Sequence, residues 1–212
     1  MRKIIVLYDC RGQRSSLECL DFRKGYMSLQ PPVNSRQDIG RPVADFQLTT
    51  IAGDQVNLQT VLSRKKGAVV VFWSGICSHC VRYDGYFNGF PRQYPELGIV
   101  AVASREKETP EQLRAIAADR RLTFPILHDP GSRAANLWFT QQTPRVFLID
   151  NNRVLRYRGA IDNFKYPQDP EYVAYLDPAI RQFLDGKPIS RTETASFGCA
   201  IQSVYYNLPK AL

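Results

Sequence analysis

The sequence predicts an α/β protein with one central mixed sheet flanked by helices. Residues 68–73 and 99–103 are continuous apolar runs of strand length, as expected for central strands covered on both faces. Helical signals between these two runs favour a strand–helix–strand unit with parallel strands. Residues 146–150 and 154–158 turn on Asn151-Asn152, which adds an antiparallel pair to the sheet.

Turn and spacing patterns predict the elements around the first central strand. Two short alternating segments on either side of Gly53-Asp54 predict a hairpin over residues 46–58. Residues 78–90 carry apolar side chains at helical spacing, although two glycines weaken the pattern. The first central strand is therefore expected to run directly into a helix.

Capping signals predict the elements that follow the second central strand. Thr109-Pro110-Glu111 combines an N-cap residue with proline at the first helical position, which opens a helix. Shorter patterns predict a strand at residues 124–127, a short helix at 134–139 and a final helix at 172–184.

Residues 1–37 are predicted to form a basic N-terminal extension ahead of one domain at residues 38–212. The 212-residue chain is 44% hydrophobic, which is ordinary for a globular protein with its own core. Half of the formal net charge of +8 lies in the extension, where seven Arg and Lys face three Asp and Glu. These charges are scattered and no recognition motif accompanies them, so we expect a solvated basic surface and no nucleic-acid partner.

The apolar segment near the N-terminus lacks the features of a clear signal peptide. Residues 4–8 fall short of the roughly 7 to 15 apolar residues required, and Asp9 follows them. No stretch approaches the roughly 20 apolar residues of a membrane-spanning helix, so no membrane span is expected. Five cysteines with one close pair do not form a secreted disulfide framework. The sequence therefore does not decide between cytoplasm and periplasm, and it does not determine the oligomeric state.

Cys77-Ser78-His79-Cys80 is the strongest candidate site, because it lies where a buried strand runs into a helix. Two cysteines at this spacing can close a small disulfide ring, in which the first sulfur faces outward and the second is shielded. A helix N-terminus lowers the pKa of the first thiol, and only the thiolate is nucleophilic. The pattern predicts a thiol-disulfide oxidoreductase in which Cys77 attacks a substrate disulfide and Cys80 resolves the mixed disulfide.

His79 is a third candidate catalytic residue. Its imidazolium or ring N–H would stabilise the Cys77 thiolate, the alternative being an incidental surface histidine. A structural zinc site would need a second ligand pair, and a haem site would need histidine at the position of Val81. We therefore expect no metal and no cofactor, and we expect protein or small-molecule disulfides and thiols as partners.

Thr143, Pro144 and Trp73 are the candidate substrate-binding residues. A Thr-Pro sequence just ahead of a strand favours a cis peptide bond here. That arrangement would place the Thr143 backbone near the sulfurs and offer main-chain groups to an extended substrate. Trp73, at the end of the strand before the pair, either flanks the site or packs in the core.

Three cysteines lie outside the pair. Cys199 is a candidate third redox centre or resolving thiol, the alternative being a buried tail cysteine without a redox role. Whether Cys10 and Cys19 pair with each other is left open.

Several motifs surround the pair, namely GRPVADF at residues 40–46, VFWS at 71–74, TPRVFLID at 143–150, YRGAID at 157–162 and FGCAI at 197–201. With these motifs, residues 38–201 resemble the thioredoxin superfamily, and within it the redoxin branch of AhpC/TSA, peroxiredoxin-like and TlpA/ResA-like proteins. The tail motif, with its Gly-Cys-x-Ile pattern, is the most specific mark. The resemblance implies a thioredoxin fold with an inserted helix and strand, and redox function at Cys77 and Cys80.

Positions at which the sequence departs from the family pattern indicate two alternative functions. Val71 stands where thioredoxin has a buried Asp, and His79 stands where it has Pro, and both changes favour an oxidising enzyme over a general reductant. Ser74, three residues before Cys77, matches a peroxiredoxin element, although Val70 replaces its proline. The first alternative is therefore a peroxiredoxin-like thiol peroxidase with Cys77 as peroxidatic cysteine. The second is a redox-linked protein-binding or assembly module that uses the basic extension for contacts.

Overall fold

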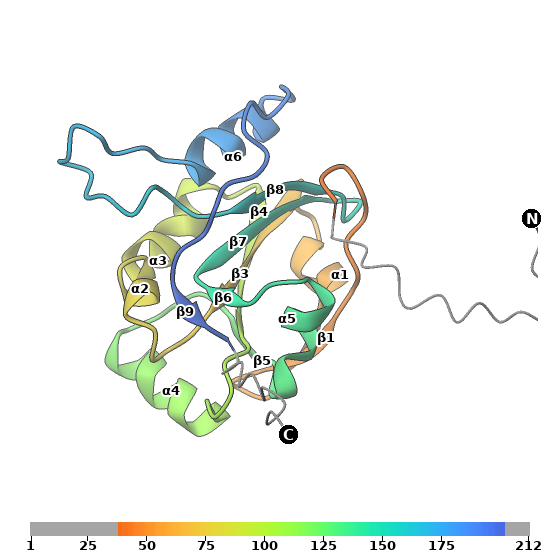
Figure 1. Cartoon of the computed structure of the whole chain (residues 1–212). Helices are drawn as coiled ribbons and strands as arrows, with labels where there is room; N and C mark the ends of the chain where they lie inside the picture. The colour runs from red at the N-terminus through yellow and green to blue at the C-terminus, as the bar shows by residue number, and fades with distance from the viewer. Residues whose placement is uncertain (1–37, 202–212) are drawn as a thin grey trace, which may run out of the picture. The chain divides into compact units, whose positions relative to one another are not determined.

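The computed structural model describes residues 38–201, which contain a seven-stranded mixed sheet of order β2-β1-β5-β4-β3-β7-β8 (Figure 1). The strands are β1 (Gln47–Thr50), β2 (Gln55–Asn57), β3 (Gly67–Trp73), β4 (Leu97–Ala103), β5 (Ile126–His128), β7 (Arg145–Asp150) and β8 (Leu155–Gly159). A separate small sheet pairs β6 (Gln142–Thr143) with β9 (Cys199–Ala200). β3 lies between parallel β4 and antiparallel β7, so the strand that precedes the cysteine pair is central.

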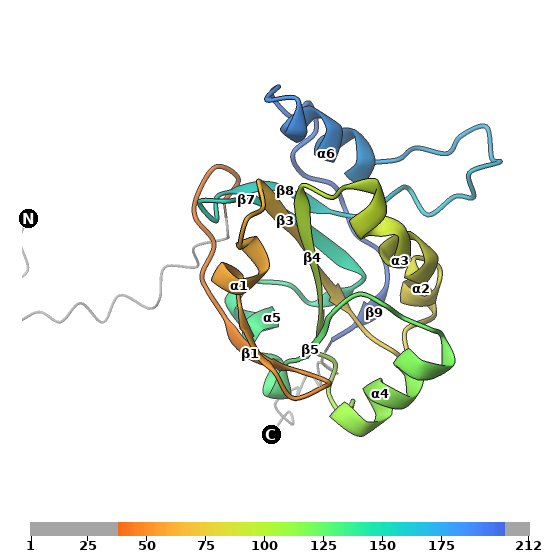
Figure 2. The same cartoon turned by 180° about the vertical axis from the view of Figure 1, so that it is seen from behind.

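Helices cover both faces of this sheet (Figures 1 and 2). They are α1 (Leu58–Leu62), α2 (Ser78–Val81), α3 (Asp84–Gln93), α4 (Pro110–Asp119), α5 (Arg133–Leu137) and α6 (Leu176–Leu184). Side chains of β3 alternate between two cores, with Val69 and Val71 on the side of α2, α3 and α6. Val70 and Phe72 face the side of α1 and α5. The arrangement confirms the predicted α/β class, a mixed sheet flanked by helices.

The hairpin and the capped helix are present as predicted. β1 and β2 pair in antiparallel register. Thr109 caps α4, since its hydroxyl accepts from the Gln112 N–H at 3.3 Å while the Gln112 side chain accepts from the Thr109 N–H at 3.0 Å. α4 and β5 form an inserted unit between β4 and α5, and β5 extends the sheet in parallel with β4. The short helix α1 has no counterpart in the sequence prediction.

The helix predicted over residues 78–90 is broken into α2 and α3. The Tyr83 N–H donates to the Cys80 carbonyl at 2.9 Å, a tighter turn than an α-helix makes. The Tyr83 hydroxyl donates to Asp162 at 2.6 Å, a contact with a distant loop that fixes this turn. The two glycines that weakened the prediction lie inside α3, so the break does not fall at either of them.

The final helix is shorter than predicted, because its first turn contains Pro178 and the preceding residues form a loop. Residues 163–173 project from the sheet and are closed at their base by a bridge between Asp162 and Ala174 (Figure 1). This loop brings Asp162 and Phe164 toward the helix that carries the cysteine pair.

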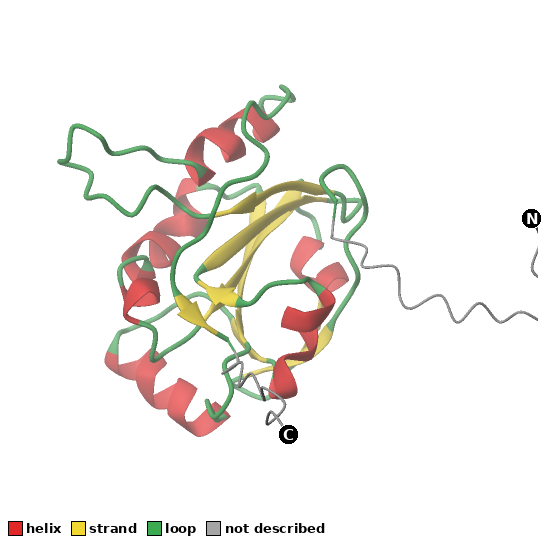
Figure 3. Cartoon of the chain, viewed as in Figure 1, coloured by secondary structure: helices red, strands yellow, loops and turns green. Residues whose placement is uncertain are grey.

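Some predictions concern residues outside the described range. The basic extension, its apolar segment at residues 4–8, and Cys10 and Cys19 all precede residue 38. The boundary between extension and domain therefore stays a prediction. Over residues 38–201, none of the helices drawn in Figure 3 has the length and apolar character required to cross a bilayer.

Candidate active site

Cys77 and Cys80 lie at the junction of β3 and α2, as predicted. Cys77 is the N-cap of α2, with an extended backbone conformation (φ −88°, ψ 114°). The Cys80 N–H donates to the Cys77 carbonyl at 2.9 Å, so one helical turn brings the two residues together. Because α2 has only four residues, the dipole behind Cys77 is that of a single turn.

Neighbouring groups hold Cys77 in its ionised form. In the thiol form its Sγ can donate to the Thr143 carbonyl at 3.3 Å. A hydrogen bond from Cys80 lowers the pKa of Cys77 to about 3, against the opposing effect of burial and with smaller contributions from Cys199 and Thr143. The second thiol of the pair is thus the main activator, in addition to the moderate effect expected of the helix N-terminus. A lowered pKa favours the thiolate, which is the nucleophilic form of a cysteine.

Cys80 has the opposite character. It is fully buried, and its pKa is raised far above the usual range, first by burial and then by the hydrogen bond and charge of Cys77. A protonated Cys80 is therefore available to donate to the Cys77 thiolate. When Cys77 enters a mixed disulfide its charge disappears, so part of the cause that keeps Cys80 protonated disappears with it.

The loop opposite the pair is built on Thr143 and Pro144. Their peptide bond is cis, as predicted, and the Thr143 carbonyl is the group that lies against Cys77. Thr143 belongs to β6 and pairs with Cys199 of β9 in antiparallel register, 56 residues further along the chain (Figure 1). The tail of the described chain therefore lies beside the cysteine pair.

This small sheet brings three soft donors together. The sulfurs of Cys77 and Cys199 and a ring nitrogen of His79 lie within 4.8 Å of one another. The closest measured contact of this group joins the Cys199 Sγ to the His79 Nδ1 at 3.8 Å. Two thiols and an imidazole form a donor set that soft metal ions accept. Ligand spacing in the sequence does not indicate this set, because Cys199 and His79 are 120 residues apart.

One predicted site residue, Cys77, is less exposed than the sequence suggests. Cys77 is 0% exposed, whereas its place in the pair predicts an outward-facing sulfur. The tail contributes to this burial, since it places Cys199 within 4.8 Å of the Cys77 sulfur, beside Thr143. Trp73 is also fully buried, and its indole N–H donates to Asp84 at 3.2 Å, so it packs in the core beneath the pair.

A buried carboxylate supports the turn between β3 and Cys77. Glu108 is 4% exposed, and its Oε1 accepts from the N–H groups of Gly75 at 2.7 Å and Ile76 at 3.3 Å. Burial raises the pKa of Glu108, against hydrogen bonds from Ser74 and the two backbone N–H groups. Glu108 is not predictable from the sequence, since an acidic residue just before a capped helix is ordinarily a solvated one and no local pattern indicates the contact.

Apolar side chains are exposed around the covered sulfurs. Ile76 is 59% exposed and Phe197, next to the tail cysteine, is 67% exposed. Phe164 packs its ring on His79 with centroids 4.9 Å apart, and a small pocket beside Pro144 is lined by both phenylalanines. The rim of the site is therefore apolar.

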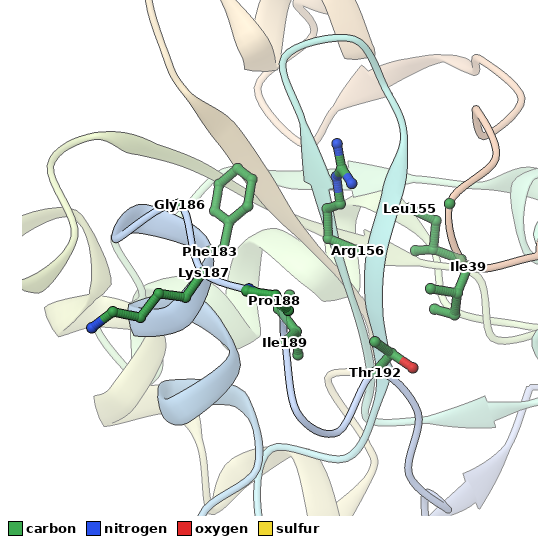
Figure 4. Close-up of a pocket in the computed structure, with 10 residues that line it drawn as sticks. Ile39, Leu155, Arg156, Phe183, Gly186, Lys187, Pro188, Ile189 and Thr192 are labelled. Carbon is green, nitrogen blue, oxygen red and sulfur yellow. The ribbon is translucent and has the colours of Figure 1, made fainter.

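Another cavity lies away from the cysteines. Its wall combines Arg156 of β8 with Phe183 of α6 and Pro188 of the segment that follows α6 (Figure 4). None of the three clustered donors lines it. We therefore place the candidate active site at the cysteine pair.

The chain belongs to the AhpC/TSA family, whose model matches residues 39–158, more than half of its length. Thiol-disulfide oxidoreductase ResA of Bacillus cereus is 26% identical over 117 residues, which cover 55% of this chain and 66% of that protein. The chain thus matches just under two thirds of the length of this relative. Thioredoxin-like protein YneN of Bacillus subtilis is 29% identical over 119 residues, which cover 55% of this chain and 68% of that protein.

A solved structure shares the architecture. The crystal structure of a hypothetical protein from Sinorhizobium meliloti 1021 is 28% identical, with a TM-score of 0.69 over 77% of this chain and 93% of that one. Together with the strand order around β3, these likenesses confirm the thioredoxin fold expected from the sequence motifs.

Proposed function

We propose that this protein is a thiol-disulfide oxidoreductase in which Cys77 is the attacking thiolate and Cys80 the resolving thiol. The observation that carries the proposal is the opposite shift of the two pKa values within one helical turn. The pKa of Cys77 is lowered to about 3, chiefly by Cys80, and the pKa of Cys80 is raised by burial. Such a divergence separates the roles of two groups at one site, here nucleophile and protonated donor.

The reaction proceeds in two exchange steps. The Cys77 thiolate attacks one sulfur of a substrate disulfide, the substrate S–S bond breaks, and the second substrate sulfur leaves as a thiolate. Cys80 then loses its proton and attacks the Cys77 sulfur, which releases the first substrate sulfur and closes the Cys77–Cys80 disulfide. The reverse sequence transfers a disulfide to a dithiol substrate. In either direction the electron pairs stay on sulfur and no cofactor is required.

The lowered pKa favours the oxidising direction. A group that stabilises the Cys77 thiolate stabilises the reduced form of the pair, so the disulfide form becomes a stronger oxidant. We therefore propose disulfide donation to protein dithiols as the preferred activity.

The substrate class follows from the rim of the site. Ile76 and Phe197 expose apolar surface near the sulfurs, and β6 would offer main-chain groups next to Cys77 once β9 has left it. An extended protein segment with an apolar residue beside its cysteine would use both features. A small disulfide would use the sulfur chemistry alone.

Insulin reduction driven by dithiothreitol tests the proposal. The wild-type chain should accelerate precipitation of the reduced insulin chains, and Cys77→Ser should return the rate to that of dithiothreitol alone. A Cys10→Ser/Cys19→Ser double variant is the matched control and should keep the wild-type rate. An equal rate for Cys77→Ser and wild type would overturn the proposal.

Two further measurements separate the alternative functions. Cys77-dependent consumption of hydrogen peroxide, without insulin reduction, would support a peroxiredoxin-like peroxidase. A protein partner that binds equally well after Cys77→Ser and Cys80→Ser would support a redox-linked binding or assembly module.

A further inference from the structure

The chain's own tail lies where an extended substrate would bind. β9 pairs with β6 in antiparallel register, and β6 is the strand whose Thr143 carbonyl lies 3.3 Å from the Cys77 sulfur. A substrate strand that paired with β6 would have to replace β9, because both need the same backbone edge. The residue of β9 opposite Thr143 is a cysteine, Cys199.

Specific contacts hold the tail in this position. Ile201 is 3% exposed, its N–H donates to the Gln141 carbonyl at 2.9 Å, and its carbonyl accepts from the Glu106 N–H at 3.2 Å. At Gly198, a Cβ atom would overlap the Thr143 carbonyl oxygen, so only glycine permits this approach of the two backbones. The position of Cys199 is therefore fixed from both sides.

The sulfur of Cys199 is within reach of Cys77. The two sulfurs lie within 4.8 Å, and a side-chain rotation of Cys199 with a small shift of the short strand can close this gap to the roughly 2.05 Å of a disulfide. The His79 Nδ1, 3.8 Å from the Cys199 sulfur, is placed to accept the thiol proton. Cys199 is in addition only partly buried, so it can leave the site with the tail.

We propose that Cys199 is a second resolving thiol for Cys77, delivered by a tail strand that occupies the position of the substrate. This role rests on the proposed function, since it requires an attacking Cys77. The site then has two internal disulfides, Cys77–Cys80 and Cys77–Cys199, and the second covers the reactive sulfur with the tail.

The exchange is balanced without an external oxidant. After Cys77 has formed a mixed disulfide with a small disulfide, which leaves β9 paired with β6, Cys199 loses its proton to His79 and attacks the Cys77 sulfur. The bond from Cys77 to the substrate breaks, the substrate sulfur leaves as a thiolate, and that thiolate is then protonated. One disulfide is broken and one is formed. Burial and the Cys77 charge raise the pKa of Cys199, so it is a protonated reserve thiol while Cys77 is free.

Titration with 5,5′-dithiobis(2-nitrobenzoate) tests this role in variants that all carry Cys10→Ser and Cys19→Ser. With Cys80→Ala added, we expect two thiobenzoates released per chain and a Cys77–Cys199 disulfide in the peptide map, with no adduct left. With Cys80→Ala and Cys199→Ala added, we expect one thiobenzoate released and one adduct retained on Cys77. Cys80→Ser repeats the first measurement with a different side chain at the buried position.

The outcomes separate this inference from the proposed function. A stable adduct on Cys77 in both Cys80 variants, with Cys199 intact, would overturn the role of Cys199. Cys199→Ala with Cys77 and Cys80 intact should release two thiobenzoates and form the Cys77–Cys80 disulfide. If that variant instead keeps its adduct while Cys80→Ala forms Cys77–Cys199, the proposed pair fails and the tail thiol is the only resolving group.

Discussion

The turn that carries Cys77 and Cys80 (residues 73–80) and the tail that carries Cys199 (residues 197–201) reach the same sulfur by different routes. The turn is local, because β3 ends and α2 begins within a few residues. The tail has no regular structure of its own beyond a two-residue strand, and contacts with distant residues hold it. The nucleophile is therefore built locally, whereas its access is controlled by long-range contacts.

The two regions also act on Cys77 with different strength. The hydrogen bond from Cys80, in the turn, is the largest cause of its lowered pKa, and the contribution of Cys199, in the tail, is smaller. We infer that the turn sets the reactivity of Cys77 and that the tail chiefly sets its exposure.

The largest predicted effect is on the titration of Cys77. In the reduced protein, thiolate absorbance near 240 nm should titrate with a pKa of about 3 against an ordinary value of 9.0. Cys80→Ala should raise this pKa more than Cys199→Ala does, since it removes the larger stabilising hydrogen bond. Equal shifts in the two variants would contradict the division between turn and tail.

The same lowered pKa predicts how stability depends on pH. A thiol that is more acidic in the folded state than in the unfolded state stabilises the fold at pH values above its unfolded pKa. This contribution is lost as pH falls from about 9 toward about 3. The difference in unfolding free energy between reduced wild type and Cys77→Ser should therefore decrease as pH is lowered, measured by urea denaturation.

An intermediate effect is expected from loosening the tail alone. Gly198→Ala should displace β9, because its Cβ would overlap the Thr143 carbonyl oxygen, at a cost of roughly 1–3 kcal/mol. Since each 1.4 kcal/mol is tenfold in an equilibrium, alkylation of Cys77 by iodoacetamide should accelerate by roughly 5- to 100-fold.

Gly85→Ala is the matched control for that variant. No heavy atom lies within 4 Å of a Cβ placed at Gly85, and the residue is inside α3, where alanine is favoured over glycine. It should leave the alkylation rate of Cys77 at the wild-type value. Equal rates for Gly198→Ala and wild type would show that the tail does not limit access.

The same division between local features and long-range contacts separates what could be predicted from the sequence from what could not. The central strands, the pair at a strand-to-helix junction and the cis Thr143–Pro144 bond depend on local patterns, and all three are found. The exposure of Cys77 was predicted wrongly, because its cover is a strand more than a hundred residues further along the chain. Spacing rules do not indicate which surface a short tail segment will cover.

Two long-range contacts in the fold show what local sequence patterns could not predict. The break at Tyr83 depends on its hydrogen bond to Asp162, and the role of Glu108 depends on the Gly75 N–H. Neither contact leaves a periodic or capping signal, since each joins elements that are far apart in the sequence. Family motifs locate such positions only when the contact itself belongs to the motif.

The smallest predicted effect concerns Glu108, in the loop that supports both regions. Its carboxylate accepts from the Gly75 N–H of the turn, while the Glu106 N–H donates to the Ile201 carbonyl of the tail. Because burial raises the pKa of Glu108, its ionisation weakens the fold as pH rises. Glu108→Gln keeps the acceptor oxygen without that charge, so its stability relative to wild type should improve from acid to neutral pH.

Glu111, one turn further on α4, is the control with the opposite sign. It is exposed, and its pKa is lowered by its own backbone N–H, by Thr109 and by Arg114. Glu111→Gln should therefore lose stability relative to wild type over the same pH range, measured by the same urea denaturation. If the stability of both variants relative to wild type changes with pH in the same direction, burial does not determine the pKa of the Glu108 carboxylate. If Glu108→Gln in addition exposes Cys77 to alkylation, the supports of turn and tail are coupled through this loop and the two regions are not independent.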